Sequence, residues 1–401
     1  MKVIFIRLKK NLFSIIFILI ALCLILFSKS NLSAAKEGLY LWANNVVPSL
    51  FPFFVITELL SYTNVIHYIG KLFDKLMRPL FHVPGECAYA FFMGLISGYP
   101  TGGKVVSSMR EQGLCTKDEG DRMLAFTNNS GPLFIVSCVG VSMFGDTKTG
   151  FLLLITHILA AISVGIILGK LSKKNSKFSP KFSTKHIPKS NNLETITLSN
   201  LGKILGKSIQ NAISTVLVIG GFVVTFSVFL SILNSCNILD YLSKLLYPIF
   251  NMLNLNSSFC KPVLSGIIEL TNGVSQVSIV PITELSQNVT LCAFLLGFGG
   301  FSVLFQVYSM LSKTDLSMKK YFFGKFLQGI LAAFYTYILL KLFPTLSLDL
   351  VSTCASVVDT LVYPISFLGI SNYILLIFVL FFIVFLAFSH HEAPPKYRKA
   401  K

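Results

Sequence analysis

Long apolar runs recur from one end of this sequence to the other, and they limit its possible folds more than any other feature. A helix needs about 20 mainly apolar residues to cross a hydrocarbon core of about 30 Å. Because 53% of the residues are hydrophobic and only 13% are charged, we expect a polytopic membrane protein. The clear candidate spans are 11–28, 45–63, 126–144, 149–168, 208–233, 288–311, 322–343 and 372–389.

Basic residues gather at the N-terminus, in a linker at 169–207 and at the C-terminus, and they give a formal charge of +17. Basic residues beside apolar segments orient a membrane protein, so we expect all three regions to be cytoplasmic. The same placement disfavours nucleic acid as a partner. The cysteines are scattered without a C-x-x-C pair, so no metal site is indicated.

Two further runs, 87–103 and 262–283, carry Gly, Pro and polar residues at their centres. Four clear spans precede the basic linker and four follow it, which already keeps the three basic regions on one side. We therefore expect each further run to enter and leave the membrane on the same face, as a re-entrant hairpin. An arm of about ten residues is about 15 Å long, which reaches the bilayer midplane.

The two halves of the chain resemble each other. "LMRPLF" (76–81) precedes the first hairpin and "LLYPIF" (245–250) precedes the second, each ending an amphipathic segment expected to lie along the interface (65–81 and 238–250). The predicted fold is an all-α polytopic membrane protein with about eight transmembrane helices and two re-entrant hairpins in an inverted repeat. The expected parts are an anchor (1–43), a first repeat (44–168), the basic linker (169–207), a second repeat (208–343) and a C-terminal helix with a basic tail (344–401).

The first hairpin centres on "SGYPTGG" (97–103). Non-helical backbone at membrane depth survives only where it is buried in protein or lines a polar cavity. Half-helix N-termini there would present free N–H groups to an anion. The alternative is that the glycines only permit close helix packing. The candidate binding residues are Ser97, Gly98, Tyr99, Thr101, Gly102, Gly103 and Lys104.

Three other stretches repeat this pattern. "FTNNSGPLF" (126–134) is interpreted as a broken helix, the alternative being a surface loop. In the second half, "GIIELTNGVSQ" (266–276) places polar residues inside the second hairpin, and "GFGGFSVLFQ" (297–306) is a second break. They add as candidate binding residues Thr127, Asn128, Asn129, Ser130, Gly131, Thr271, Asn272, Gly273, Gly299, Gly300 and Gln306.

Carboxylates inside apolar runs are costly and are functional candidates by default. Glu269 and Glu58 are therefore candidates to carry a coupling ion, H+ or Na+, although either side chain could instead face water. His157 lies alone in an apolar run, and we interpret it as a hydrogen-bonded packing residue. No enzyme signature, cofactor motif or nucleotide site is present, so we expect a protein that is not an enzyme and needs no cofactor.

"FFMGLISGYPTGGKVVSSMREQGLCTKDEGDRMLAFTNNSGPLFIV" (91–136) resembles the signature region of the sporulation integral membrane protein YlbJ family, also called SpoVV. Its members contain the nucleoside-recognition, or Gate, domain. The architecture is similar to that of concentrative nucleoside transporters, in which two oppositely oriented hairpins face broken helices. The resemblance implies a role in endospore formation, in movement of dipicolinic acid across the outer forespore membrane.

We therefore expect a secondary-type transporter that binds a small carboxylated anion between the hairpins, within the lipid bilayer. One alternative is a nucleoside or nucleobase carrier. Another is a non-transporting membrane scaffold for spore coat assembly that docks proteins on the 169–207 linker. A partner membrane protein and a homo-oligomer both stay open.

Overall fold

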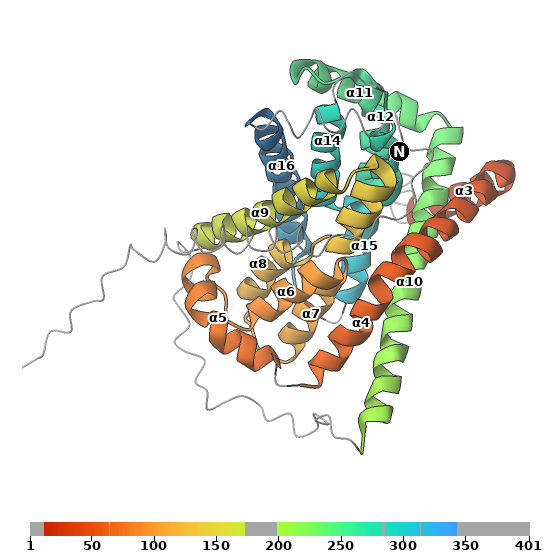
Figure 1. Ribbon diagram of the computed structural model, residues 1–401. Helices are drawn as coiled ribbons and strands as arrows, with labels where there is room; N and C mark the ends of the chain where they lie inside the picture. Colours follow the sequence, from red (N-terminus) through yellow and green to blue (C-terminus); the bar gives the residue numbers. More distant parts are fainter. Residues whose placement is uncertain (1–11, 64, 173–198, 282–284, 313, 343–401) are drawn as a thin grey trace, which may run out of the picture. The chain divides into compact units, whose positions relative to one another are not determined.

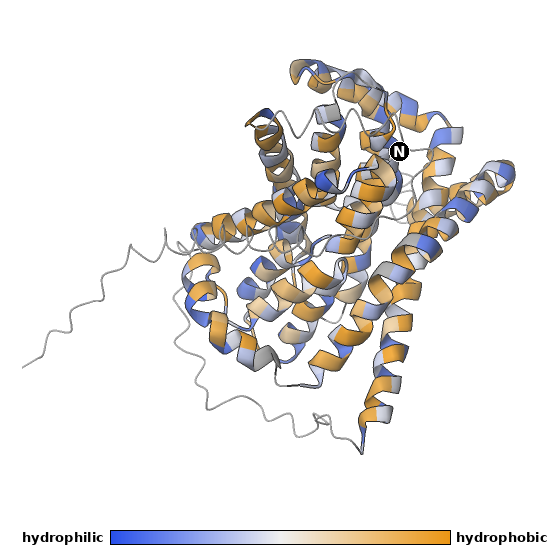
Figure 2. Ribbon diagram, viewed as in Figure 1, coloured by the Kyte–Doolittle hydropathy of each residue, from blue (hydrophilic) through white to orange (hydrophobic). Residues whose placement is uncertain are grey.

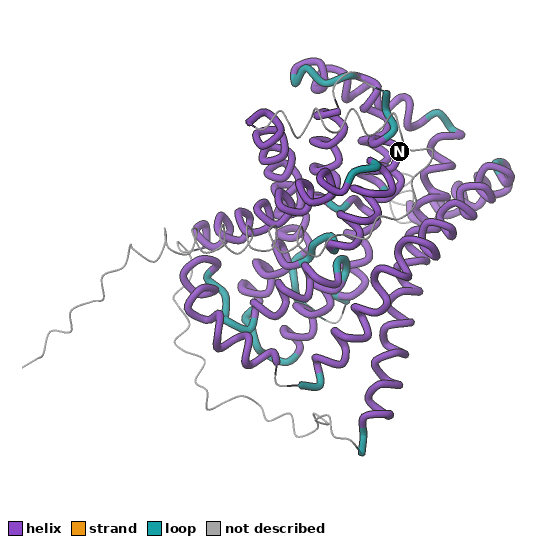
Figure 3. The backbone as a smooth tube through the Cα atoms, in the orientation of Figure 1, coloured by secondary structure: helices purple, strands orange, loops and turns teal. Residues whose placement is uncertain are grey.

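The computed structural model describes residues 12–63, 65–172, 199–281, 285–312 and 314–342. Throughout these ranges the chain is helical, with short connections and no strand (Figure 3). The predicted span at 372–389 and most of the basic linker lie outside the described residues. The helices are α2 Leu12–Leu26, α3 Ser28–Leu41, η1 Trp42–Val46, α4 Val47–Ser61, α5 Val65–Phe81, α6 Cys87–Ser97, α7 Thr101–Glu111, α8 Lys117–Thr127, η2 Leu133–Met143, α9 Thr147–Ser172, α10 Leu201–Ser235, α11 Ile238–Met252, η3 Ser257–Phe259, α12 Cys260–Ile268, α13 Leu270–Ser278, α14 Leu285–Phe298, α15 Gly300–Met310 and α16 Met318–Leu342.

Fewer helices than the sequence predicts are long and apolar enough to cross a membrane. Among the described residues there are four: α9, α10, α16 and the stretch Ser286–Met310. A fifth results if α2 and the helix after it, bent by 96°, count as one span. Hydrophobic residues occur along all the long helices (Figure 2). Large apolar side chains such as Phe323 and Phe334 on α16 and Leu217 on α10 are exposed, as expected for surfaces that face lipid.

Both predicted hairpins are pairs of short helices that contact each other, α6 with α7 and α12 with α13. In the first, α6 ends at Gly98, whose φ of +76° places it in the left-handed region that favours glycine. In the second, Glu269 is extended, with φ −136° and ψ 117°, and separates α12 from α13. Each predicted hairpin, 87–103 and 262–283, thus contains a helix break, at 98–100 and at Glu269.

The predicted span 126–144 is not one helix. α8 ends at Thr127, Asn128 is extended, and residues 128–131 are non-helical before the π-helix η2 begins at Leu133. Pro132 disfavours a helical conformation for the residue before it, which explains the position of the break. The corresponding stretch at 288–311 is interrupted at Gly299, with φ +86°, between α14 and α15.

The same order of elements occurs twice along the chain. An amphipathic helix, a hairpin, a broken helix and a long helix follow one another as α5 to α9 and again as α11 to α16. The two halves pack together: α3 and α4 lie beside α10 (Figure 1), and α9 contacts α16. Across the halves, α7 contacts α15 and α13 contacts η2. The four interruptions are thereby brought into one region.

Candidate functional site

A cavity of about 60 Å³ lies where the interruptions meet. Its wall takes residues from η1, α4, α10, α15, both hairpins and the break before η2. Since a buried water needs about 10–15 Å³ of such volume, the cavity has room for a few waters. Its polar lining residues are Tyr99, Ser130, Glu269, Thr271 and Gln306, all of which the sequence indicated.

The tip of the first hairpin is tied to both halves of the chain. The hydroxyls of Ser97 and Thr57 lie 2.8 Å apart, and the Tyr99 hydroxyl donates to the Leu296 carbonyl oxygen at 2.8 Å. The hydroxyls of Thr101 and Thr127 are both buried, and neither has a hydrogen-bond partner in the described part of the chain. Tyr99 is therefore both a cavity wall and a link between the halves.

The glycines of this hairpin contact the break that follows it. A Cβ on Gly98 would lie 2.8 Å from the Gly131 nitrogen, and one on Gly102 would lie 2.3 Å from the Thr127 carbonyl oxygen. Gly103 donates its N–H to Asn128 Oδ1 at 3.3 Å. At Gly102 these contacts match the close-packing alternative, because only a glycine allows the two backbones to approach so closely.

Lys104 and Glu58, two of the charged candidates, form an ion pair with each other. Asn211 donates to the second Glu58 oxygen at 3.2 Å, and Thr215 lies 3.4 Å from Lys104 Nζ. Neither member of the pair lines the cavity. The lysine predicted to face the anion is thus neutralised by the carboxylate predicted to carry the coupling ion.

The break at 128–131 is hydrogen-bonded to α9 and α16. Asn128 donates to the Tyr321 hydroxyl at 2.6 Å, and Asn129 Oδ1 accepts from Gln328 at 2.9 Å. The Ser130 N–H donates to His157 Nε2 at 3.2 Å, so His157 is hydrogen-bonded, as expected. These asparagines hold the break open and do not face the cavity.

Lys325, in α16, belongs to the same network, and the sequence reasoning missed it. Its side chain is completely buried, and its ammonium donates to the Asn128 carbonyl oxygen at 2.8 Å and to Gln328 Oε1 at 2.6 Å. It also lies 5.1 Å from the centre of the Tyr99 ring. A lysine inside the apolar run 322–343 is the signal that could have found it.

Glu269 caps its own helix at the tip of the second hairpin. Its carboxylate accepts the N–H of Thr271 at 3.2 Å and of Asn272 at 2.8 Å. The side chain is buried, and no lysine, arginine or histidine of the described residues pairs with it. The free amides expected at this tip are therefore already occupied by a carboxylate of the chain.

The remaining candidates pack the second hairpin. A Cβ on Gly273 would lie 1.9 Å from the Gly266 Cα, and one on Gly300 would lie 2.8 Å from the Gly266 carbonyl oxygen. Gly299 lies beside the Tyr99 hydroxyl, which joins the second break to the first hairpin. Gly273, Gly299 and Gly300 thus form close contacts outside the cavity lining.

A second cavity, of about 950 Å³, lies on the other side of the second hairpin tip. Asn272 lines it and donates to the Ser227 hydroxyl at 3.0 Å. Its wall is rich in hydroxyl and amide groups from α3, α10 and the hairpin. Neighbouring residues of one hairpin tip line the two cavities: Glu269 and Thr271 line the smaller, and Asn272 lines the larger.

Comparison with known proteins agrees with this arrangement. The Gate family, described as "Nucleoside recognition", matches residues 43–167 and 216–314, and each segment contains one hairpin and one broken helix. The chain is 34% identical over 332 residues to the sporulation integral membrane protein YlbJ of Bacillus subtilis (strain 168). That similarity covers 81% of each protein. The chain belongs to the YlbJ family. It is thus an integral membrane protein of sporulation with a Gate domain. No solved structure matches it.

Proposed function

We propose that the chain is a secondary-type transporter of a small carboxylated anion, dipicolinate, across the outer forespore membrane. The observation that carries the proposal is the cavity formed jointly by both hairpins and both broken helices. Interrupted helices from two repeats that meet at one cavity are typical of secondary transporters. Tyr99, Ser130, Thr271 and Gln306 offer an aromatic face, hydroxyls and an amide to a planar carboxylated ring.

Glu269 gives the proposal a coupling mechanism. It is the acidic residue of the cavity wall, and no cation of the described chain neutralises it. Two carboxylates side by side in a low-dielectric site repel each other strongly. Protonation of Glu269 removes this repulsion, so an anion and a proton bind together. The coupling ion is accordingly H+.

The second hairpin serves as a gate in this proposal. The cavity of about 60 Å³ is smaller than the roughly 300–1,000 Å³ of ordinary small-molecule sites. The second cavity, of about 950 Å³, lies within that range. Movement of residues 269–272 would join the two cavities. The structure then corresponds to a closed state, in which the substrate would reach the smaller cavity through the second one.

Uptake of labelled dipicolinate into proteoliposomes tests the proposal. Gln306→Leu and Thr271→Val remove polar groups of the cavity wall, and we expect each to lower uptake by at least about tenfold, because a lost hydrogen bond to a charged group costs about 1.5–3 kcal/mol. Gln112→Leu, at an exposed residue after α7, is the matched control. Wild-type uptake by both cavity variants would refute the site. Normal spore dipicolinate in cells that carry them would refute the role.

A nucleoside or nucleobase carrier is the second candidate, because the matching family is described as nucleoside recognition. Tyr99 and Phe134 in the cavity wall could stack on a base. Competition for binding separates the two candidates: in a nucleoside carrier, uridine would compete for the site and dipicolinate would not. The scaffold alternative concerns the 169–207 linker, most of which lies outside the described residues.

A further inference from the structure

The first break lies against the buried amino group of Lys325, which has no carboxylate partner among the described residues. Lys325 is completely buried within α16, and no carboxylate of the described residues lies within salt-bridge distance of its ammonium. A charge taken out of water needs compensating interactions, and an unpaired lysine in a membrane helix is costly. Neutral groups must therefore supply the stabilisation.

The groups around the ammonium are those that bind a bare monovalent cation. They are the Asn128 main-chain oxygen, Gln328 Oε1 and the face of the Tyr99 ring. Carbonyl oxygens replace the hydration shell of alkali-metal ions in proteins, and aromatic faces attract cations. Asn128 has an extended backbone, so its carbonyl oxygen is released from the helix and is free to take this role.

We propose that the break at 128–131, together with Gln328 and Tyr99, is a monovalent-cation site that the ammonium of Lys325 fills. The chain thus carries its own tethered cation and needs no Na+ or K+ to hold the break in shape. Gln328 joins the ammonium to the break, because its amide oxygen accepts from Lys325 and its amide nitrogen donates to Asn129 Oδ1. This inference concerns ion binding alone and does not depend on the substrate.

Lys325 also lies close to the cavity. Tyr99 lines the cavity, and Lys325 Nζ lies 5.1 Å from the centre of its ring. The Lys325 side chain therefore lies behind one cavity wall. Glu269 lies on another wall.

Thermal unfolding of the purified wild-type protein gives the first test and needs no variant. At matched ionic strength, we expect the same melting temperature in sodium, potassium and choline chloride. A rise of the melting temperature with the logarithm of Na+ or K+ concentration, abolished by Gln328→Leu, would mean that the site takes an ion in addition to the lysine. That result would overturn the proposal.

Removal of the lysine gives the second test. We expect Lys325→Ala to melt more than about 5 °C lower in choline chloride and to recover as Na+, K+ or methylammonium is added. The double variant with Gln328→Leu should lose this recovery. Lys341→Ala, which removes an exposed lysine of the same helix beside the Tyr337 ring, should stay insensitive to the cation. Equal loss of stability of Lys325→Ala in every salt would refute a cation site.

Discussion

At the scale of single residues, two of the four helix interruptions are bound to ionisable side chains of opposite type. Lys325 lies at the break 128–131, held by carbonyl oxygens, and Glu269 lies at the tip of the second hairpin, held by main-chain amides. Each charge is therefore stabilised by the backbone groups that its own break leaves without a helical partner. Such charges cost less to bury than isolated ones, since hydrogen bonds replace those lost with water.

Glu269→Gln should separate the capping role of this residue from its charge. The amide oxygen of glutamine still accepts from the α13 N–H groups, so we expect a loss of about 1 kcal/mol of stability or less. Uptake by this variant should no longer rise as the external pH falls. The measurement is initial uptake across a pH series beside the melting temperature. An unchanged pH dependence would contradict proton coupling through Glu269.

Gly273→Ala should destabilise the second hairpin, because the new Cβ would lie 1.9 Å from the Gly266 Cα. Overpacking of this kind costs about 1–3 kcal/mol. Gly221→Ala is the control: in α10 a Cβ at this position meets nothing within 4 Å, and alanine there should be neutral or gain up to about 1 kcal/mol. Thermal unfolding of both variants checks the pair, and equal melting temperatures would show that the hairpin arms separate freely.

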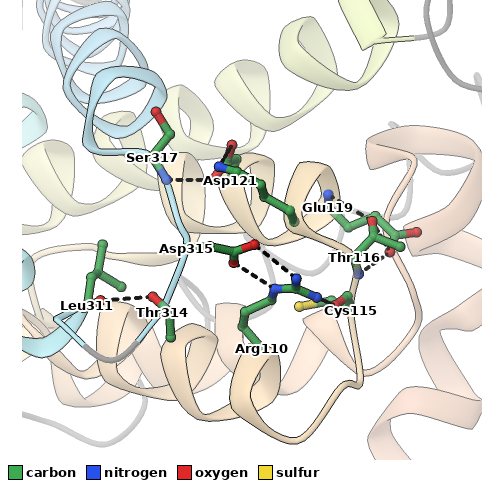
Figure 4. Close-up of polar contacts among 10 residues, drawn as sticks. Arg110, Cys115, Thr116, Glu119, Asp121, Leu311, Thr314, Asp315 and Ser317 are labelled. Carbon is green, nitrogen blue, oxygen red and sulfur yellow. Dashed lines mark hydrogen bonds and ion pairs between the residues drawn. The ribbon is translucent and has the colours of Figure 1, made fainter.

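At the scale of elements, a polar cluster joins the end of the first hairpin to the loop before α16 (Figure 4). Arg110, in α7, donates to both Asp315 oxygens at 2.9 and 3.1 Å and to the Cys115 carbonyl oxygen. Asp121, in α8, accepts the Ser317 N–H at 2.7 Å. The cluster fixes the distance between the two repeats at one end of their contact.

Asp315→Asn should weaken this connection in a pH-dependent way. The hydrogen bond from Arg110 lowers the pKa of Asp315 below its ordinary value. A lowered pKa means that the pair stabilises the fold above the unfolded pKa of about 3.9 and that this contribution is lost as the pH falls through the lower, folded value. Both side chains are partly exposed, so the effect should be small. Melting curves of wild type and variant should differ slightly at neutral pH and converge in acid.

The interruptions could be predicted from the sequence because glycine and proline act locally. "SGYPTGG", "NNSGP" and "GFGG" each mark a break where the structure has one. The pairing of side chains could not be predicted, because it depends on residues far apart in the chain. Lys104 meets Glu58, and Lys325 meets Asn128, 197 positions away. Only this packing shows which polar residues of the breaks line the cavity and which form hydrogen bonds elsewhere.

At the scale of the whole molecule, the order of elements is repeated, and the opposite orientation of the two units stays a prediction. Labelling of single cysteines in a cysteine-free background tests this orientation. Gln112 follows the first hairpin and Ser257 precedes the second, and both are exposed. We expect an impermeant thiol reagent to modify Gln112→Cys from the cytoplasmic face and Ser257→Cys from the opposite face. Modification of both from one face would contradict the inverted repeat.

The cap on α13 has a consequence for the unloaded protein. A bare helix N-terminus attracts any small anion, and chloride and phosphate are abundant around every membrane. Here Glu269 already satisfies those amides and lines the cavity. In the transport proposed above, an ionised Glu269 would therefore repel inorganic anions at the position where an uncapped helix would bind them.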